Sequence, residues 1–481
     1  MKRGKIFGIE LLVLEAVLTV GFSIFIGKSS LLPVGWFIAM IAVLVVILGL
    51  GAFLILWKDK KARLIVGMCL SLLASVGIFM TYYYVSPAVK LLQQITDEYD
   101  EMAKVSAYVL DTDPAQSLQD AVSYPFGILA VMDRTNSDKA LDKMKQELGQ
   151  TIVPQEYGSI TELADALTNG QVKVIVVNES LLSVLDDVEG YESFSDTIRE
   201  INTQKIVIEP VMEDEDTPEV ESRVFTVYIS GIDGWGGIEA VGRSDVNIIA
   251  TVNMDTKQIL LVSTPRDYFV PLPVSNGVRD KLTHAGIYGV DCSEGALEEL
   301  YGMDIDYYFR VNFSGFEKII DALGGIDVYS EYDFTVANWH YQVGMNHLDG
   351  LSALAFARER HAFAGGDLVR GQNQMRVIEA TLKKCMSPAI ISNYTEVLDS
   401  VEGSFQTDMP YEVITSFVRE QISTGGDWEV QTYGVTGTGN HSGTYSIPNQ
   451  NLYVMEPDYS TVEQAKEYMQ QIRNGESIEI V

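Results

Sequence analysis

Two patterns of apolar residues divide the chain near residue 85. Before that point the apolar residues form long unbroken runs, and residues 31–57 and 64–89 contain no charged side chain. A helix needs about 20 residues to cross roughly 30 Å of hydrocarbon, so each run is long enough to span a membrane. Residues 6–27 form a third predicted span, which Glu10 and Glu15 interrupt. The opening "MKRGK" resembles a signal peptide, but no small-residue cleavage site follows, so we expect an uncleaved span.

The basic residues between the spans predict their orientation. "MKRGK" precedes the first span and "KDKKAR" (58–63) joins the second to the third, whereas the loop between the first two spans offers only Lys28. Short basic loops stay on the cytoplasmic side. We therefore predict a multi-pass protein of the plasma membrane with a cytoplasmic N-terminus, membrane lipid around its spans and a large extracellular C-terminal part. Glu15 lies deep in the first span, where an ionisable group either serves a function or pairs within the helix bundle.

Shorter elements follow the predicted anchor. Residues 86–110 have helical spacing of apolar residues, which predicts a helical stalk. Residues 111–210 alternate between strand-like and helix-like segments and predict a small accessory α/β domain without a catalytic constellation. An acidic, proline-containing linker is predicted at 211–222, followed by the main domain at 223–481. The accessory strands are expected at 126–133 and 172–178, and its helices at 137–149 and 160–170.

Polar residues gather where the strands of the main domain begin or end. Alternating runs predict strands at 224–230, 246–254 and 258–264, with "MDTK" as the turn between the last two. The residues next to these strands are Asp233, Arg243, Asp245, Arg266 and Asp267. Loops at strand ends can converge on one edge of a sheet, and two carboxylates there can chelate Mg²⁺, which prefers oxygen ligands. Turn aspartates more often cap their own loops, so the pair Asp233 and Asp245 by itself leaves both readings open.

Composition and charge exclude one class of function. The chain carries 34 Lys+Arg and 66 Asp+Glu, a net charge of -32, and its first 85 residues hold eight of the basic and three of the acidic residues. Nucleic-acid binding needs a broad basic surface, so no nucleic-acid partner is expected. Three cysteines are too few for a disulfide framework and are not spaced as metal ligands. A bridge between Cys292 and Cys385 stays open.

Against this acidic background, three arginines cluster in "AFARERHAFAGGDLVRGQNQ" (355–374). The spacing predicts a helix that breaks near Arg358 and Arg360, and a second helix from Asp367 as N-cap to about residue 386. Arg370 and Gln374 then lie on one face of the second helix. One interpretation is that these arginines form surface salt bridges. A cluster of several beside two glycines and a helix start favours a phosphate or pyrophosphate cradle, because guanidinium binds phosphate oxygens in pairs and keeps its charge.

Five successive segments together resemble the LytR-CpsA-Psr family over roughly residues 224–400. They are "GRSDVNIIATVN", "LLVSTPRD", "DYYFRVNFSGFEKIIDALGGIDV", "LDGLSALAFARER" and "GDLVRGQNQ". The three-span anchor and the accessory domain are similar to the streptococcal capsule-associated CpsA branch. The resemblance implies an α/β/α sandwich that holds a polyprenyl (pyro)phosphate, with the lipid in an apolar tunnel and the head group at an arginine-rich mouth. It also implies transfer of a lipid-linked glycopolymer, in that branch capsular polysaccharide, to a peptidoglycan acceptor outside the membrane.

Carried onto this sequence, the resemblance implies roles for particular residues. Asp233 and Asp245 match the metal-binding acidic positions. The matches to the head-group contacts are Arg243, Arg266, Arg358, Arg360, Arg370 and Gln374. Where many members have an "INxA" motif this chain has "KLTHAG", so we expect Lys281 to bind substrate and His284 to be packed or hydrogen-bonded. One helical face with Phe316, Ile319, Ile320 and Leu323 suits either the tunnel or an ordinary core.

The expected reaction is phosphoryl transfer, in which positioning and charge stabilisation supply most of the rate. We expect Asp245, Arg266 and Asp367 to be catalytic and Mg²⁺ to be the cofactor. Asp367 or Asp267 is the expected base. Three alternatives stay open: a membrane regulator of polymer synthesis, a lipid carrier without catalysis, and a pyrophosphatase with water as the acceptor.

Overall fold

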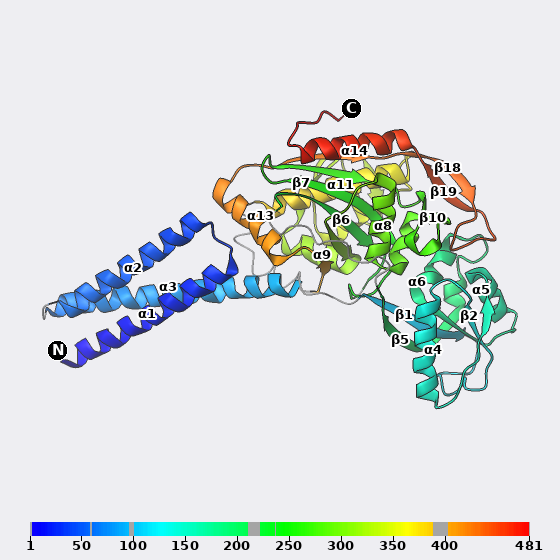
Figure 1. The fold of residues 1–481 in the computed structure, drawn as a ribbon, viewed down its shortest axis with the longest axis horizontal. Coiled ribbons are helices and arrows are strands. Elements are labelled where there is room, and N and C mark those ends of the chain that lie inside the picture. Colours follow the sequence, from blue (N-terminus) through cyan, green and yellow to red (C-terminus); the bar gives the residue numbers. More distant parts are fainter. Residues whose placement is uncertain are drawn as a thin grey trace. The chain divides into compact units, whose positions relative to one another are not determined.

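The computed structural model describes residues 2–57, 60–95, 101–209, 222–235, 237–387 and 403–480. The chain divides into two compact units, and each is described by itself. The first unit comprises residues 1–97, 390–402 and 409–427, and the second comprises residues 98–389, 403–408 and 428–481. Figure 1 shows the helices and strands of both units in sequence colours.

The first unit contains three long apolar helices, α1 (Lys2–Ser29), α2 (Val34–Leu56) and α3 (Lys61–Ile95). Three segments of these helices are long and apolar enough to cross a membrane, namely Gly4–Ser29, Val34–Leu56 and Lys61–Pro87. The prediction of a three-helix membrane anchor is confirmed. A fourth helix, α13 (Tyr411–Thr424), belongs to the same unit, and the Tyr411 hydroxyl donates a 2.7 Å hydrogen bond to the carbonyl oxygen of Ser29.

Glu15 lies inside the helix bundle of the first unit. Its side chain is 1% exposed, and its Oε2 atom has no hydrogen-bond partner among the described residues. A Cβ atom added to Gly51 on α2 would lie 2.8 Å from Ser71 Oγ on α3 and 3.6 Å from Glu15 Oε2. The missing side chain at Gly51 therefore lets the three helices approach one another around this carboxyl group.

The accessory domain is a five-stranded sheet with strand order β3-β2-β4-β1-β5. Its strands are β1 (Met102–Leu110), β2 (Phe126–Leu129), β3 (Gln155–Tyr157), β4 (Val174–Asn178) and β5 (Ile198–Val207). Its helices are α4 (Arg134–Leu148), α5 (Ile160–Thr168) and α6 (Glu179–Leu182), followed by the 3-10 helices η1 (Ser183–Asp187) and η2 (Phe194–Thr197). The predicted strands and helices of this domain are confirmed, with ends that differ by a few residues.

The predicted stalk helix at 86–110 is wrong for residues 102–110, which form strand β1. β1 pairs antiparallel with both β4 and β5, so its backbone groups are hydrogen-bonded on both sides. Ala103, Val105, Ala107 and Val109 are fully buried at alternate positions. This alternation of period two fits a strand, and pairing with distant strands outweighed the local helical spacing. The predicted linker at 211–222 lies outside the described residues apart from Ser222.

The main domain is built on a mixed six-stranded sheet with the order β16-β11-β6-β7-β8-β17. The strands are β6 (Val224–Ile232), β7 (Ser244–Asn253), β8 (Gln258–Ser263), β11 (Tyr307–Asn312), β16 (Phe405–Thr407) and β17 (Glu429–Gly434). The three predicted strands correspond to β6, β7 and β8, and the predicted turn joins β7 to β8. β6 pairs parallel with β11 and β8 pairs parallel with β17, while β7 runs antiparallel between them.

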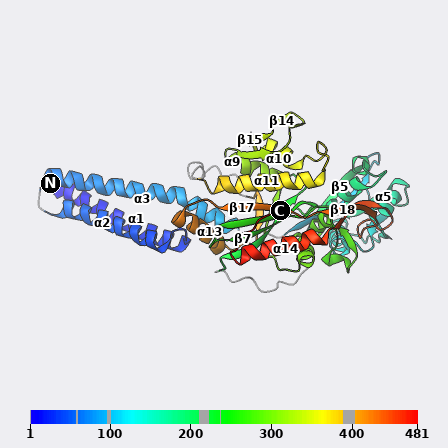
Figure 2. The same ribbon diagram turned by 90° about the horizontal axis from the view of Figure 1, so that it is seen from above.

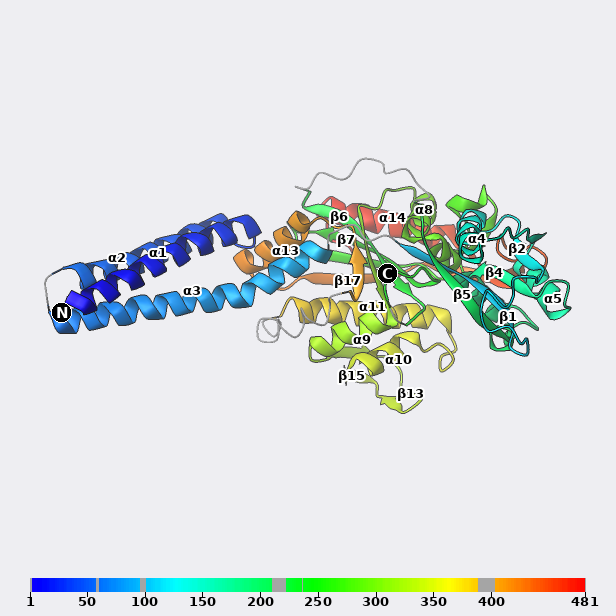
Figure 3. The same cartoon turned by 90° about the horizontal axis from the view of Figure 1, so that it is seen from below.

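Helices cover both faces of this sheet. α11 (Asp367–Cys385) packs against β7, β8 and β17, and α14 (Tyr459–Arg473) packs against β7 and β8. Figure 2 and Figure 3 show these two helices on opposite faces of the sheet, which confirms the α/β/α sandwich. The other helices are α7 (Leu282–Ala285), α8 (Val290–Tyr301), α9 (Phe313–Ala322) and α10 (Gly350–Arg358).

Short hairpins complete the main domain. They pair β9 (Phe269–Pro271) with β10 (Arg279–Lys281), β12 (Ile326–Ser330) with β15 (Gly344–Leu348), β13 (Phe334–Val336) with β14 (Trp339–Tyr341), and β18 (Gly437–Ser442) with β19 (Leu452–Pro457). Two 3-10 helices, η3 (Pro273–Ser275) and η4 (Gly286–Tyr288), flank α7. Gly350 begins α10 where a Cβ atom would lie 2.4 Å from the carbonyl oxygen of Glu317 on α9. Only glycine lets these two helices approach so closely.

The direction of the strands brings several loops to one edge of the sheet. Because β7 runs opposite to its neighbours, the carboxyl ends of β6, β8, β11 and β17 share an edge with the amino end of β7. Asp233 follows β6, Arg243 and Asp245 lie at the start of β7, and Arg266 follows β8. The topology therefore explains why polar residues far apart in the sequence meet at this edge.

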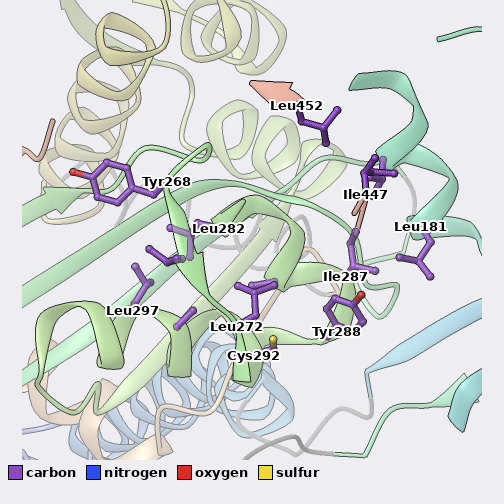
Figure 4. Packing of buried hydrophobic residues seen from close by; sticks show 14 of the residues in the cluster. Leu181, Tyr268, Leu272, Leu282, Ile287, Tyr288, Cys292, Leu297, Ile447 and Leu452 are labelled. Atoms are coloured by element: carbon purple, nitrogen blue, oxygen red, sulfur yellow. The ribbon is translucent and has the colours of Figure 1, made fainter. Parts of the chain in front are cut away.

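One hydrophobic cluster runs through both the accessory domain and the main domain. It contains Leu181, Val184 and Leu185 from the accessory domain together with Ile287 and Ile447 from the main domain. Figure 4 shows Leu181 beside Ile287 and Ile447. A shared core of this kind fixes the two domains against each other, so residues from both can contribute to one site.

Candidate active site

The first part of the site is an ion pair between the two ends of the β6–β7 connection. Arg243 Nη2 lies 2.9 Å from Asp233 Oδ2, and the Asp233 amide donates to the Arg243 carbonyl oxygen at 2.9 Å. Arg243 Nη1 also donates to the carbonyl oxygen of Ser183 at 3.1 Å and lies 3.8 Å from Asp187 Oδ2. Ser183 and Asp187 belong to η1 of the accessory domain, so that domain contributes to the site.

The second part is a buried pair of Asp245 and Arg266. Arg266 Nη1 lies 2.7 Å from each oxygen of Asp245, and the Thr283 hydroxyl donates to Asp245 Oδ1 at 3.0 Å. Burial raises the pKa of Asp245, but the charges of Arg266, Arg370 and Arg243 outweigh it and hold that pKa below its ordinary value. Burial lowers the pKa of Arg266, whereas Asp245 and the neighbouring carboxylates raise it well above normal. Both side chains are therefore charged at neutral pH.

Lys281 is the third cation at this edge. Its side chain is 4% exposed, and its Nζ lies 3.2 Å from Asp187 Oδ2 and 3.3 Å from Asp267 Oδ1. Asp267 Oδ1 also lies 3.7 Å from Arg266 Nε. His284, three residues after Lys281, is fully buried with its Nδ1 2.7 Å from Asp280 Oδ1, as expected for a packed, hydrogen-bonded histidine.

The start of α11 supplies the fourth part of the site. Arg370 and Gln374 are 6% and 8% exposed and lie on the same face of this helix, as predicted. The prediction that Asp367 is the N-cap is wrong, because Gly366 caps α11 with a φ of 50° and Asp367 is the first helical residue. Asp367 instead forms an ion pair with Arg370. Burial raises the pKa of Asp367, although Arg370 partly offsets this effect.

Arg358 and Arg360 lie farther out than the other arginines. The side chain of Arg358 is 54% exposed, with its Nη2 3.9 Å from Asp233 Oδ1 and its guanidinium 4.1 Å from the centre of the Phe313 ring. Arg360 is partly buried, and its Nε lies 3.5 Å from His361 Nε2. Arg360 still acts electrostatically on the site, because its charge lowers the pKa of Asp367.

A cavity of about 90 Å³ joins several of these groups. Five of the predicted site residues line it: Asp245, Arg266, Asp367, Arg370 and Gln374. Its other walls come from the end of β8, the first turns of α11 and the residues after β17. Lys281, Arg243 and Asp233 connect to this cavity through Asp187 and Arg266. Arg358 and Arg360 are not among its lining residues.

Two carboxylates at this edge suit the ligand preference of Mg²⁺. That ion takes one or two carboxylates and otherwise waters and substrate phosphates. Asp233 and Asp245 face Arg243 and Arg266 respectively, and no group of three or more His, Cys, Asp or Glu side chains in the described part of the chain is placed to hold a metal ion. Both carboxylates have the chemistry of a magnesium ligand, and each is paired with an arginine. The assignment stays a prediction.

Some predicted features lie away from the cavity. Cys292 and Cys385 are free thiols, so the open question of a bridge between them is answered. Ile320 belongs to the core around Phe334 and Phe356, and Phe316 packs against the same core. An ordinary core position therefore accounts for these two residues of the proposed tunnel face.

Asp187 is the site residue that the sequence analysis missed. It contacts Lys281 across 94 positions of sequence. It lies in "SVLDDVEG", where no motif or charge pattern distinguishes it from the neighbouring Asp186. The accessory domain, in which the sequence shows no catalytic constellation, thus contributes one carboxylate to the candidate site.

Taken together, these cations are the candidate groups for the predicted phosphate cradle. Arg243, Arg266, Lys281 and Arg370 are at most 10% exposed, and each has an acidic partner that holds its charge in place. Buried guanidinium groups that are fixed in this way can bind phosphoryl oxygens without reorganising. The adjacent carboxylates Asp367 and Asp267 can accept a proton.

Comparison with known proteins identifies relatives of this chain. The model of the LytR_cpsA_psr family matches residues 189–471. A polyisoprenyl-teichoic acid–peptidoglycan teichoic acid transferase TagU from Enterococcus faecalis is 34% identical over 217 residues, which cover 45% of this chain and 71% of that protein. The TagU of Bacillus mycoides is 34% identical over 226 residues, which cover 46% and 71%. The crystal structure of B. subtilis TagV is 26% identical, covers 53% of this chain and 99% of its own, and has a TM-score of 0.45.

Proposed function

Because this chain belongs to the LytR_cpsA_psr family, we propose that it transfers a polyprenyl-linked glycopolymer to peptidoglycan. Relatives named as transferases of polyisoprenyl-linked teichoic acid to peptidoglycan support this class of substrate and acceptor. The three-span anchor with an accessory domain resembles the capsule-associated branch of the family. We therefore propose capsular polysaccharide as the polymer and a polyprenyl pyrophosphate as its carrier.

The observation that carries the proposal is the cavity between β8 and α11. Asp245, Arg266, Asp367, Arg370 and Gln374 line one space of about 90 Å³. Arginines bind phosphate oxygens in pairs, an amide such as Gln374 donates a neutral hydrogen bond, and a carboxylate can accept a proton. Positioning, charge stabilisation and a proton acceptor are the contributions that a protein makes to phosphoryl transfer.

In the proposed reaction, a hydroxyl oxygen of peptidoglycan attacks the phosphorus that is attached to the glycopolymer. A new P–O bond forms to the acceptor, and the bond between that phosphorus and the bridging oxygen breaks. Polyprenyl phosphate leaves with the bridging oxygen and its electron pair. Arg266 and Arg370 hold the non-bridging oxygens while negative charge moves toward the leaving group.

Asp367 is the stronger of the two candidates for the base. It lines the cavity, and burial raises its pKa, which makes the carboxylate a better proton acceptor than an ordinary aspartate. Asp267 is 5% exposed and lies close to both Lys281 and Arg266, but it is not among the residues that line the cavity. We propose that Asp367 accepts the proton of the attacking hydroxyl and that Asp267 orients Lys281 and Arg266.

Asp233 and Asp245 are the residues that would hold Mg²⁺ in this proposal. When bound, the ion would offset negative charge on the pyrophosphate. The same two carboxylates pair with Arg243 and Arg266. The membrane anchor would keep the site at the surface where a polyprenyl-linked substrate resides. The proposed orientation, with both α/β domains outside, rests on the charges of the loops between the spans.

The direct test uses the full chain in lipid nanodiscs. It is incubated with a polyprenyl-pyrophosphate-linked oligosaccharide and a soluble peptidoglycan fragment, and the products are identified by mass spectrometry. A fragment whose mass increases by the oligosaccharide phosphate supports the proposal, particularly if the product disappears in Asp367→Asn. Release of free oligosaccharide phosphate would indicate hydrolysis by water instead. Retention of intact substrate, without either product, would indicate a lipid carrier.

A further inference from the structure

The accessory domain places one carboxylate among three cations of the site. Asp187 Oδ2 lies 3.2 Å from Lys281 Nζ, 3.6 Å from Arg266 Nη2 and 3.8 Å from Arg243 Nη1. Asp187 is the last residue of η1, whereas the three cations come from the main domain. The site is therefore assembled from two domains, and the contact between them is electrostatic as well as hydrophobic.

The segment that carries Asp187 is firmly packed. Val184 and Leu185 on η1 are fully buried in the cluster that also contains main-domain residues. Just before η1, the Ser180 hydroxyl donates a 2.7 Å hydrogen bond to the carbonyl oxygen of Val241, and Ser183 accepts from Arg243 at 3.1 Å. A lid that opens on binding would have to expose this buried surface. The packing therefore favours a fixed residue over a movable gate.

Asp187 matters most to Lys281. Nearly all of the Lys281 side chain is buried, and its two acidic neighbours are Asp187 and Asp267. A buried ammonium group needs compensating charge, because transfer out of water disfavours its charged form. Without Asp187, Lys281 would shift toward Asp267, which also lies near Arg266. Loss of one carboxylate would then disturb two cations of the cradle.

The charge state of Asp187 is consistent with such a role. Burial raises its pKa, but Lys281, Arg266 and Arg243 together hold that pKa below the ordinary value for aspartate. The side chain is thus ionised at neutral pH. An ionised group that is stabilised by three cations is a weak proton acceptor, so the geometry excludes Asp187 as a good general base and leaves it the task of orienting its neighbours.

We propose that Asp187 is a positioning residue, through which the accessory domain holds Lys281, Arg266 and Arg243 in the arrangement that binds the pyrophosphate head group. This inference rests on the proposed function, since it names the role of the accessory domain in the same site. It predicts that the accessory domain is required for full activity of the main domain and is not an independent module.

The test compares two neighbouring carboxylates on η1 in the full chain in nanodiscs. Asp187→Asn removes the contact with Lys281, and Asp186→Asn removes the same charge from the adjacent, exposed side chain. We expect kcat/KM for transfer to fall by about tenfold or more in Asp187→Asn, as for loss of a charge-assisted contact, and by less than about twofold in Asp186→Asn. Equal effects of the two substitutions would show a response to overall charge and would overturn the proposal. An increase in activity in Asp187→Asn would overturn it in favour of an inhibitory contact.

A double variant shows whether Asp187 acts through Lys281. If it does, Asp187→Asn combined with Lys281→Gln should be little worse than Lys281→Gln alone, because the second change removes an interaction that is already lost. Multiplication of the two single effects would mean that Asp187 acts independently of Lys281, which contradicts the positioning of Lys281 by Asp187. A purely structural defect would also appear as a lower thermal midpoint in Asp187→Asn than in Asp186→Asn.

Affinity for polyprenyl pyrophosphate is measured on the same variants. A wild-type protein that binds this lipid but transfers no polymer would refute the proposed function. In that case the inference about Asp187 is decided by affinity alone: a selective loss in Asp187→Asn supports it, and unchanged affinity overturns it. Failure of the proposed function and failure of the inference about Asp187 are therefore distinguishable.

Discussion

Asp245→Asn should destabilise the folded chain by an amount that depends on pH. The substitution keeps the shape of the side chain and removes the charge that faces Arg266, whose side chain is 7% exposed against 20% for Asp245. Breaking a buried ion pair by removing one partner costs about 3–5 kcal/mol. Arg266 retains Asp187 and Asp267 within 3.7 Å, and asparagine can still accept a hydrogen bond. We therefore expect a smaller loss of about 1.5–3 kcal/mol, typical of a hydrogen bond to a charged group.

A surface pair in the same sheet provides a matched control. Asp255 in the β7–β8 turn lies 2.5 Å from Arg223, but the two side chains are 62% and 43% exposed. Exposed pairs contribute about 0–1 kcal/mol. With a shift of roughly 2 °C per kcal/mol for a domain of this size, Asp245→Asn should lower the thermal midpoint at neutral pH by about 3–6 °C, and Asp255→Asn by about 2 °C at most. Thermal unfolding of the full chain in nanodiscs measures both.

The pH dependence tests the electrostatic origin of the effect. Because the folded protein holds the pKa of Asp245 below its unfolded value of about 3.9, the charged carboxylate stabilises the fold above that pH. The contribution is lost as the pH falls through the lowered pKa. The difference between wild type and Asp245→Asn should therefore narrow on acidification below about pH 4. Equal midpoints at neutral pH, or a difference that does not change with pH, would refute the reasoning.

Three further outcomes are expected. Arg370→Ala should weaken retention of polyprenyl pyrophosphate by about tenfold or more, whereas Lys383→Ala, which removes an exposed cation from the same helix, should not; equal retention in both variants would contradict the cradle. The rate of transfer by the wild type should decline on acidification, and at a higher pH than for a base with the pKa of an ordinary aspartate, because burial raises the pKa of Asp367. A pH–rate profile without this decline would show that Asp367 is not the base. After replacement of the native cysteines, an impermeant thiol reagent applied to intact cells should label Val153→Cys, an 83% exposed position, and leave Lys60→Cys unlabelled; labelling at position 60 would reverse the proposed topology.

Local pattern was sufficient to predict the anchor and the central strands of the main domain. The three spans are long and mostly apolar helices, and their length and composition meet the requirement of a membrane. In β6, β7 and β8 the apolar residues alternate with polar ones or form continuous runs, and turn residues bound each strand. The observed strand ends therefore agree with the predicted ones within a few positions. α11 likewise begins at Asp367 and ends at Cys385, close to the predicted limits. In each case the signal lies within a short stretch of sequence.

Local pattern failed where hydrogen-bond partners come from far along the chain. Residues 102–110 have a spacing that also suits a helix, but they form β1 because β4 and β5 pair with both of its edges. Asp367 has the residue type of an N-cap. In the structure Gly366, which has a positive φ, occupies the N-cap position, and the Asp367 carboxylate pairs with Arg370. Propensity is a weak prior in both cases, and tertiary contacts decide the outcome.

The candidate site shows the same division. The sequence determined which arginines and aspartates are available at strand ends and at the start of α11, because these positions follow from local patterns and from the order of the motifs. Only the tertiary structure decided which of them share a cavity: Arg370 and Gln374 do, whereas Arg358 and Arg360 lie outside its lining. It also brought Asp187 from a separate domain to Lys281 across 94 residues. Electrostatic contacts depend on distance in space, and the fold alone sets that distance for residues so far apart in the chain.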